Sequence, residues 1–262
     1  MDYGYQLLRH VVQQVFGNLR QAAQLTLLLF LVPFIGLVTL LGGMGTGQAE
    51  PPGGGIILGG LLLVVAAIVA YCWAAVGWHR YVLLEETGNG IVPRWRGDRI
   101  GAYFGRAFVV GIVVVLAVMG GGLVVGIAAA VTQSPAVAIA LGVGLVFGAS
   151  WVATRIGLVL PAAALGERMT IGESWAVTRP VSGHILLPLI VVALVVGVIQ
   201  QLILVVFGQA VTVTMFGEVQ EQYVLTLVGQ ILNGVLSWLQ VLVNLALMTT
   251  LYGNLVEGRQ LN

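Results

Sequence analysis

The 262-residue sequence has few charges, no lysine and a single cysteine. Charged residues make up 8% of the chain, whereas soluble domains carry about 25%. The absence of lysine excludes a Schiff-base enzyme and a P-loop nucleotide site, because both need that side chain. Cys72 has no second cysteine with which to form an internal disulfide.

Apolar residues dominate the composition of the sequence. They make up 59% of the chain, and the mean hydropathy is +1.03. Six stretches reach the roughly 20 apolar residues that a spanning helix needs. We therefore predict an all-α integral membrane protein with a single membrane domain, residues 1–262, and no cofactor. The expected spans are Leu25–Gly43, Ile56–Trp78, Ala107–Val131, Ala136–Leu160, Ile185–Phe207 and Val224–Leu251.

The arginines predict the orientation in the membrane. The connections 44–55, 132–135 and 208–223 carry glutamates and no arginine, and all 11 arginines fall on the other side of the predicted topology. Since positively charged loops stay in the cytoplasm, both termini are expected there. The arginine-, alanine-, glycine- and valine-rich composition favours a bacterial source, and hence the inner membrane.

Three short segments on the arginine side have helical spacing of apolar residues. They cover 5–16, 99–108 and 170–179, and the last opens with a capping-box sequence at Thr170 and Glu173. We expect each to be an amphipathic interfacial helix that leads into a hairpin of two spans. This order suggests a threefold repeat, although any six-span protein with cytoplasmic termini alternates in the same way. The repeat units would be 1–80, 92–165 and 168–254.

Two short motifs carry a family resemblance. They are the run Thr154-Arg155-Ile156-Gly157-Leu158-Val159-Leu160-Pro161-Ala162 and the triplet Glu173-Ser174-Trp175. With the amphipathic helix before each helical pair, they resemble the bacterial YciC-like inner-membrane proteins, which are similar to the membrane domain of glycerophosphodiester phosphodiesterases. The resemblance implies a six-helix membrane architecture. No esterase activity is expected, because the sequence holds no soluble phosphodiesterase domain.

Sequence patterns of catalytic and metal sites are absent. His10, His79 and His184 lie far apart and fall at the expected cytoplasmic interface, so we interpret them as polar interfacial side chains and expect no metal site. There is no Gly-x-Ser-x-Gly motif and no aspartate within a span, so no catalytic residue is assigned. The cluster Arg94–Arg99 favours membrane lipids as partners over nucleic acid, because the chain has no basic domain.

Arg155 is the most unusual charged residue, because it lies near the end of a span, six residues before Pro161. One interpretation is structural: the side chain snorkels to the interface or pairs with a carboxylate. The candidate carboxylates are Glu85, Glu86, Glu167 and Glu173. The other interpretation is a clamp for an anion or a lipid headgroup. The candidate residues for that clamp are Arg155, Arg179 and Arg106.

A polar stripe runs along the last predicted span. Its five residues are spaced 3, 4, 3 and 4 apart, so they share one helix face. The stripe consists of Gln230, Asn233, Ser237, Gln240 and Asn244. It either hydrogen-bonds to other helices, with Gln200 and Gln201 as candidate partners, or forms a cavity wall or a docking face for another chain.

Two glycine pairs predict close helix packing. Gly122 and Gly126 in the third span, and Gly144 and Gly148 in the fourth, form small-xxx-small motifs. Gly122 and Gly144 are equally far from the turn near Gln133, so we expect them to face each other. An oligomer interface is the competing interpretation.

These patterns favour a non-enzymatic inner-membrane protein that scaffolds, assembles or regulates partners, which would be another protein or a second copy. The alternative is a small transporter or lipid-handling protein that uses the polar stripe and Arg155. An intramembrane enzyme is the least favoured class.

Overall fold

The structure, a computed structural model, describes residues 2–44, 54–87, 90–215 and 218–261. Six spans are long and apolar enough to cross a membrane, so the chain is a multi-pass helical membrane protein, as predicted. They are formed by α2 (Leu19–Met44), α3 (Gly54–Leu84), α4 (Gly97–Thr132), α5 (Pro135–Ile156) with α6 (Val159–Leu165), α8 (Leu186–Phe207) and α9 (Leu227–Leu255).

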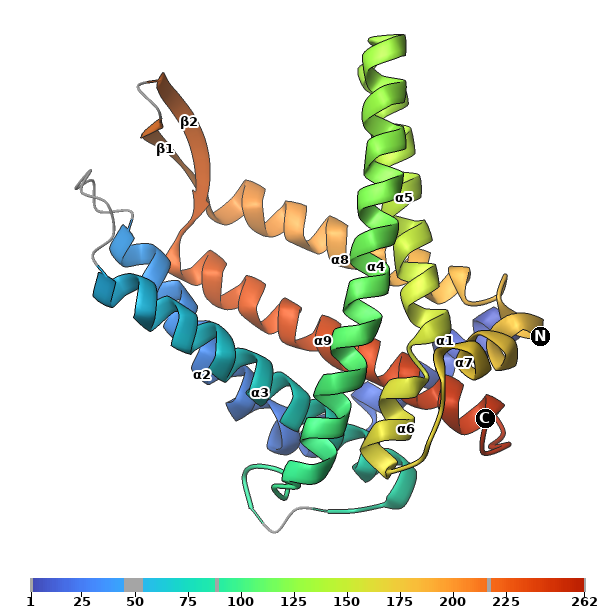
Figure 1. The fold of residues 1–262 in the computed structure, drawn as a ribbon. Helices are drawn as coiled ribbons and strands as arrows, with labels where there is room; N and C mark the ends of the chain where they lie inside the picture. Colours follow the sequence, from blue (N-terminus) through green and yellow to red (C-terminus); the bar gives the residue numbers. More distant parts are fainter. Residues whose placement is uncertain (1, 45–53, 88–89, 216–217, 262) are drawn as a thin grey trace.

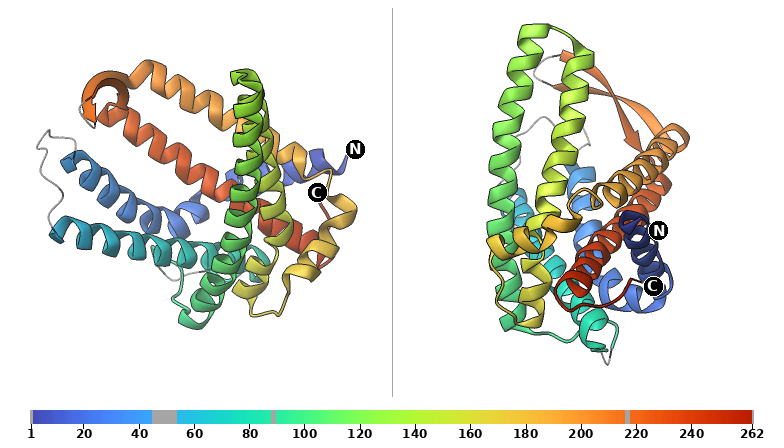
Figure 2. Two further views of the ribbon diagram at one scale, coloured as in Figure 1. Left: turned by 45° about the horizontal axis from the view of Figure 1, so that its top comes forward. Right: turned by 90° about the vertical axis from the view of Figure 1, so that its right-hand side faces the viewer.

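Consecutive long helices pack against each other. α2 lies beside α3, α4 beside α5, and α8 beside α9 (Figure 1). The three pairs meet at the end of the molecule where both termini lie, and they diverge from there (Figures 1 and 2). We call the meeting end the base. We call residues 111–145, where α4 and α5 stand apart from the other long helices, the arm.

The segments expected to be interfacial helices differ in structure. α1 (Tyr3–Phe16) is a separate helix that buries Leu7, Val11 and Val15 at the base. The segment 99–108 is not separate, because it forms the first turns of α4. No proline or left-handed residue interrupts the helix there, so its hydrogen-bond ladder continues into the span.

The third such segment forms α7 (Ile171–Thr178), followed by the short helix η1 (Arg179–Val181). The predicted capping box is confirmed. The Thr170 hydroxyl accepts from the Glu173 backbone N–H at 3.2 Å, and the Glu173 carboxylate accepts from the Thr170 N–H at 2.7 Å. The hydrogen bond from the Thr170 backbone lowers the pKa of Glu173, because it favours the charged carboxylate.

One hairpin of strands interrupts the helical fold. β1 (Gly208–Met215) pairs antiparallel with β2 (Glu218–Leu225), with Gly208 opposite Leu225. The last span was expected to start at Val224, but that residue belongs to β2. α9 starts at Leu227 because the Thr226 hydroxyl caps it, accepting from the Gly229 N–H at 3.3 Å.

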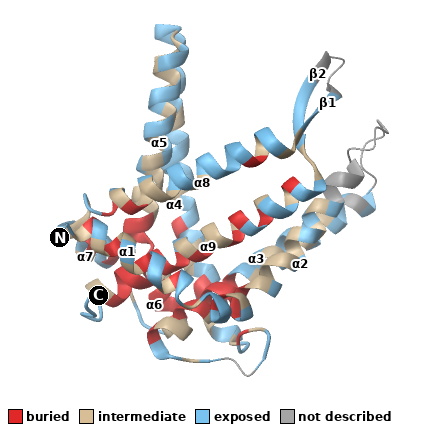
Figure 3. Ribbon diagram, turned by 180° about the vertical axis from the view of Figure 1, so that it is seen from behind, coloured by how far each residue is buried: buried red, intermediate tan, exposed pale blue. Residues whose placement is uncertain are grey.

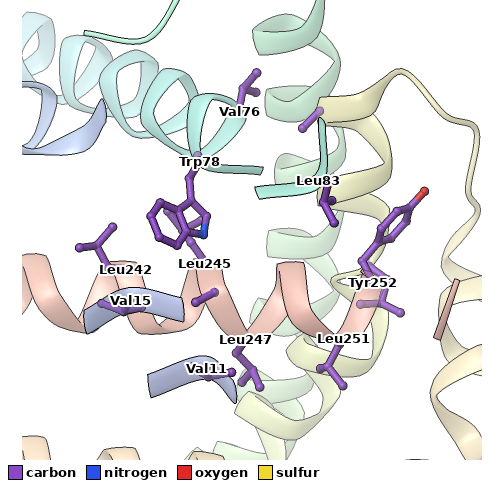
Figure 4. Packing of buried hydrophobic residues seen from close by; sticks show 14 of the residues in the cluster. Val11, Val15, Val76, Trp78, Leu83, Leu242, Leu245, Leu247, Leu251 and Tyr252 are labelled. Carbon is purple, nitrogen blue, oxygen red and sulfur yellow. The ribbon is translucent and has the colours of Figure 1, made fainter. Parts of the chain in front are cut away.

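The hydrophobic core lies at the base. Trp78 of α3 packs against Leu242 and Leu245 of α9 and against Val15 of α1 (Figure 4). Buried residues gather there, whereas the arm consists of exposed and intermediate residues (Figure 3). The structure describes every residue of the arm, and none of them is buried. Contacts at the base therefore determine how the three helix pairs are joined.

Candidate functional site

Arg155 lies in the last turn of α5, just before the helix breaks at Gly157. The helix resumes as α6, in which Pro161 is the third residue. A proline ring clashes with the carbonyl four residues earlier, here that of Gly157, so a continuous helix from α5 into α6 is disfavoured. Arg155 is therefore close to a helix end, as the proline suggested.

Ser174 of α7 satisfies backbone groups that the break leaves free. Its hydroxyl donates to the Arg155 carbonyl at 2.6 Å and accepts from the Leu158 N–H at 3.2 Å. The Ser174 side chain is fully buried, so no water could replace these two bonds. The two motifs of the family resemblance thus meet in space, and the second completes the backbone hydrogen bonding of the first.

The Arg155 guanidinium makes further contacts between α5 and α7. Its Nε donates to the Thr178 hydroxyl at 3.2 Å, and its Nη2 donates to the Trp175 carbonyl at 2.8 Å. The guanidinium carbon lies 3.5 Å from the centroid of the Trp175 ring and 4.8 Å from that of the Trp151 ring. Both distances fall within the range of a cation–π contact.

These contacts correct the structural interpretation of Arg155. The residue is 4% exposed, so the side chain does not snorkel to the surface. The expected pairing with Glu85, Glu86, Glu167 or Glu173 is wrong, since no ion pair joins Arg155 to any of these described residues. A neutral carbonyl, a hydroxyl and two indole rings hold the guanidinium instead. Arg155 joins α5 to α7.

The other two clamp candidates do not share a partner with Arg155. Arg106 of α4 donates from Nη1 to the Met169 carbonyl at 2.6 Å, which ties α4 to the segment before α7. Arg179 is exposed in η1, and its guanidinium makes no hydrogen bond or ion pair within the described ranges. An anion site formed by all three arginines stays a prediction.

Glu86 forms a second polar cluster at the base, one that the sequence did not reveal. Its carboxylate lies 2.6 Å from Arg80 and 2.7 Å from Arg96. Arg80 also donates to the Ala164 carbonyl of α6 at 3.0 Å. Burial acts to raise the pKa of Glu86, but the hydrogen bonds and charges of the two arginines outweigh it and lower that pKa. The sequence feature that could have predicted this cluster is the position of Glu86 between two arginines, 6 residues after Arg80 and 10 residues before Arg96.

His79 is not an interfacial side chain as expected. It is fully buried in α3, and its Nδ1 lies 2.7 Å from the Thr249 hydroxyl of α9. His184 does lie at the surface, 3.1 Å from Asp2. The described residues contain no group of three His, Cys, Asp or Glu side chains that could hold a metal ion.

The polar stripe on α9 divides into two parts. At the β2 end, the Gln230 amide donates to the Leu225 carbonyl at 3.0 Å, and the Ser237 hydroxyl donates to the carbonyl of Asn233 at 2.8 Å. Nearer the base, Gln240 and Asn244 line a cavity.

The predicted partners of the stripe lie elsewhere. Gln200 and Gln201 are exposed on α8, and no hydrogen bond joins them to the stripe in the part of the chain described. The pairing predicted from the sequence is therefore not formed.

The four predicted packing glycines do not face each other. A Cβ atom built on any of them would have nothing within 4 Å. They are Gly122, Gly126, Gly144 and Gly148. The close approach of α4 and α5 occurs one residue away, where a Cβ on Gly121 would collide with the Leu145 side chain. The predicted contact is wrong because the rotation of α4 places Gly121 opposite α5, which leaves the Gly122 face uncovered.

The fold and the contacts define the class of the protein: a six-span helical membrane protein whose helix pairs are joined at one end. The chain matches no protein-family model, no curated protein and no solved structure. The likeness to YciC-like proteins thus stays a prediction carried by the two motifs that meet at Arg155.

Proposed function

We propose that the protein is a non-enzymatic scaffold of the bacterial inner membrane that assembles or regulates a partner membrane protein through the arm. The observation that carries this proposal is the uncovered glycine face of the arm. A helix of another protein can approach closely only where side chains are small. Gly126 of α4, in the arm, and Gly148 of α5, just outside it, offer such positions, because a Cβ atom on either would have nothing within 4 Å.

Exposed amides on α8 support a protein partner over lipid tails alone. Gln200 and Gln201 lie six to seven residues before Phe207, about 10 Å from the end of α8 at 1.5 Å per residue. They are exposed and have no hydrogen-bond partner among the described residues. Lipid tails offer no hydrogen bonds, whereas polar side chains of a neighbouring helix do.

In this proposal the base faces the cytoplasm. All 11 arginines of the chain fall on that side of the predicted topology, and both termini lie at the base. Arg94 is exposed, so a cysteine there should react with a membrane-impermeant thiol reagent only after the membrane is opened. The test uses a background in which Cys72 is alanine. Labelling of intact cells from outside would contradict this orientation.

Transport or lipid handling through Arg155 is less favoured, because α7 already holds its guanidinium. The stripe residues nearer the base, Gln240 and Asn244, still line a cavity.

The scaffold proposal is tested by native mass spectrometry of the protein extracted with its surrounding lipid. We expect the wild type to carry a stoichiometric second membrane protein, which Gly126→Leu and Gly148→Leu lose. A Cβ atom at either position has nothing within 4 Å, and leucine favours helix more than glycine does, so both variants should fold.

Val124→Leu serves as the matched control, because Val124 is exposed on another face of α4. The control should keep the partner. A wild type that carries only lipid, or only a second copy of itself, would contradict the proposal. Retention of the partner by both glycine variants would also contradict it.

A further inference from the structure

A cavity of about 340 Å³ lies where the arm meets the base, between α5, α8 and α9. Small-molecule sites begin at about 300 Å³. Most of the wall is apolar, and none of the described side chains that line it is charged. Its polar members come from four helices: Tyr71, Tyr103, Ser150, Thr154, Gln240 and Asn244.

Several of these polar groups lack a partner in the protein. Tyr103 is 1% exposed, yet its hydroxyl makes no hydrogen bond to any described residue. Gln240, which is half-buried, and Asn244, which is exposed, lie one turn apart on α9, and their amides are likewise unpaired within the described chain. Both belong to a membrane span, where lipid tails offer no hydrogen bonds, so an unpaired amide there costs about 1–3 kcal/mol. The cavity wall therefore favours an occupant that supplies hydrogen-bonding oxygens.

The cavity is open to the outer surface of the helices. Val146 of α5 is 64% exposed and Tyr71 of α3 is 45% exposed, and both line it. These residues belong to membrane spans, so the opening faces lipid rather than water. A molecule that enters from the hydrocarbon layer can leave an acyl chain outside along α5.

We propose that this cavity binds the uncharged head of a neutral lipid, with hydroxyl and ester oxygens like those of a diacylglycerol. The two amides and the Tyr103 hydroxyl supply donors to its ester carbonyls and accept from its free hydroxyl. A phosphate head is disfavoured, because no cation among the residues that the structure describes lines the cavity to offset the cost of burying its charge. This site is independent of the scaffold proposal and does not involve Arg155.

The test is a titration of the purified full chain in detergent with dioleoylglycerol, followed by native mass spectrometry. Dioleoylphosphatidylglycerol, with the same acyl chains and a charged head, is titrated in parallel. We expect the neutral lipid to bind more tightly. Asn244→Leu should weaken its binding about tenfold, the effect of losing one hydrogen bond in a site that faces lipid rather than water.

Asn233→Leu is the matched control, because it makes the same change on the same face of α9 outside the cavity. It should leave the dissociation constant unchanged. Should Asn244→Leu fail to fold, Tyr103→Phe removes a single hydroxyl and should weaken binding severalfold. Equal affinity for the two lipids, absence of binding, or binding that neither cavity variant weakens would overturn the proposal.

Discussion

The two ends of α5 have opposite environments, although both are apolar in sequence. Residues 135–145, in the arm, include no buried residue. The segment from Thr154 through α6 to Ala164 is buried at every position but Leu160. Hydrophobicity therefore accounts for the insertion of both ends into the membrane but does not determine which end packs against other helices. Since lipid tails are as apolar as leucine, leaving lipid gains little, and hydrogen bonds and close packing decide.

The base has such contacts and the arm has few. Arg155 and Ser174 join α5 to α7, and Arg80, which Glu86 pairs with, joins α3 to α6. In the arm, the Thr132 hydroxyl bonds to nearby backbone groups: it donates to the Ala128 carbonyl of its own helix and accepts from the Ser134 N–H. We therefore expect contacts at the base to stabilise the fold, and the arm to be available for contact with other molecules. Substitutions at the base should lower the free energy of unfolding more than substitutions in the arm.

The largest effect is expected for Arg155→Leu. The change leaves the buried Trp175 carbonyl without its donor and removes the cation–π contact. We expect a loss of about 3 kcal/mol in the free energy of unfolding. The unfolding midpoint in detergent should then fall by about 6–12 °C. Arg155→Lys should lie in between, because an ammonium cannot reach both acceptors while stacked on the indole.

Ser174→Ala should have the second largest effect. It strips the Arg155 carbonyl and the Leu158 N–H of a buried partner, at a cost of about 2 kcal/mol. Ser150→Ala is the control, because that hydroxyl bonds only to the Val146 carbonyl of its own helix. Denaturant unfolding in mixed micelles measures both variants, and equal stability of the two would refute the role assigned to Ser174.

Glu86→Gln should cost about 1 kcal/mol at neutral pH, since the cluster is partly exposed to solvent. The lowered pKa of Glu86 means that its contribution is present above the unfolded pKa near 4.5. That contribution is lost as the pH falls from there through the folded pKa. Thermal unfolding between pH 7 and 3 should show a steeper loss in the wild type than in the variant. The same dependence of stability on pH in both proteins would contradict a stabilising role of the Glu86 carboxylate.

The smallest effect is expected in the arm. Leu123 is 66% exposed on α4, so Leu123→Ala removes no contact with the base. The free energy of unfolding of the partner-free protein should change by less than about 0.5 kcal/mol. The same unfolding assay measures it, and a loss as large as that of Ser174→Ala would show that the arm packs against the rest of the chain.

Composition and run length were sufficient to predict the six spans, because spanning requires only continuous apolar sequence. The capping box at Thr170 was also predictable, since it is a local pattern. The glycine contact was missed by one residue, because helix rotation depends on the side chains of the partner helix. His79 was misplaced because hydropathy does not reveal a buried hydroxyl partner 170 residues away, such as Thr249.

Arg155 shows the same limit. Its place near a helix end followed from Pro161, but its partners are a backbone carbonyl, a hydroxyl and aromatic rings. A search for opposite charges, the usual guide from sequence, points instead to Glu86, whose carboxylate binds two other arginines.

A double-mutant cycle between Arg155→Leu and Trp175→Leu tests most directly whether Arg155 joins α5 to α7. The free energy of unfolding of the wild type, both single variants and the double variant is measured in the same detergent. If the guanidinium stacks on the indole, the two changes should be coupled by about 1–2 kcal/mol. Additivity of the two effects within about 0.5 kcal/mol would contradict a stabilising contact between Arg155 and Trp175.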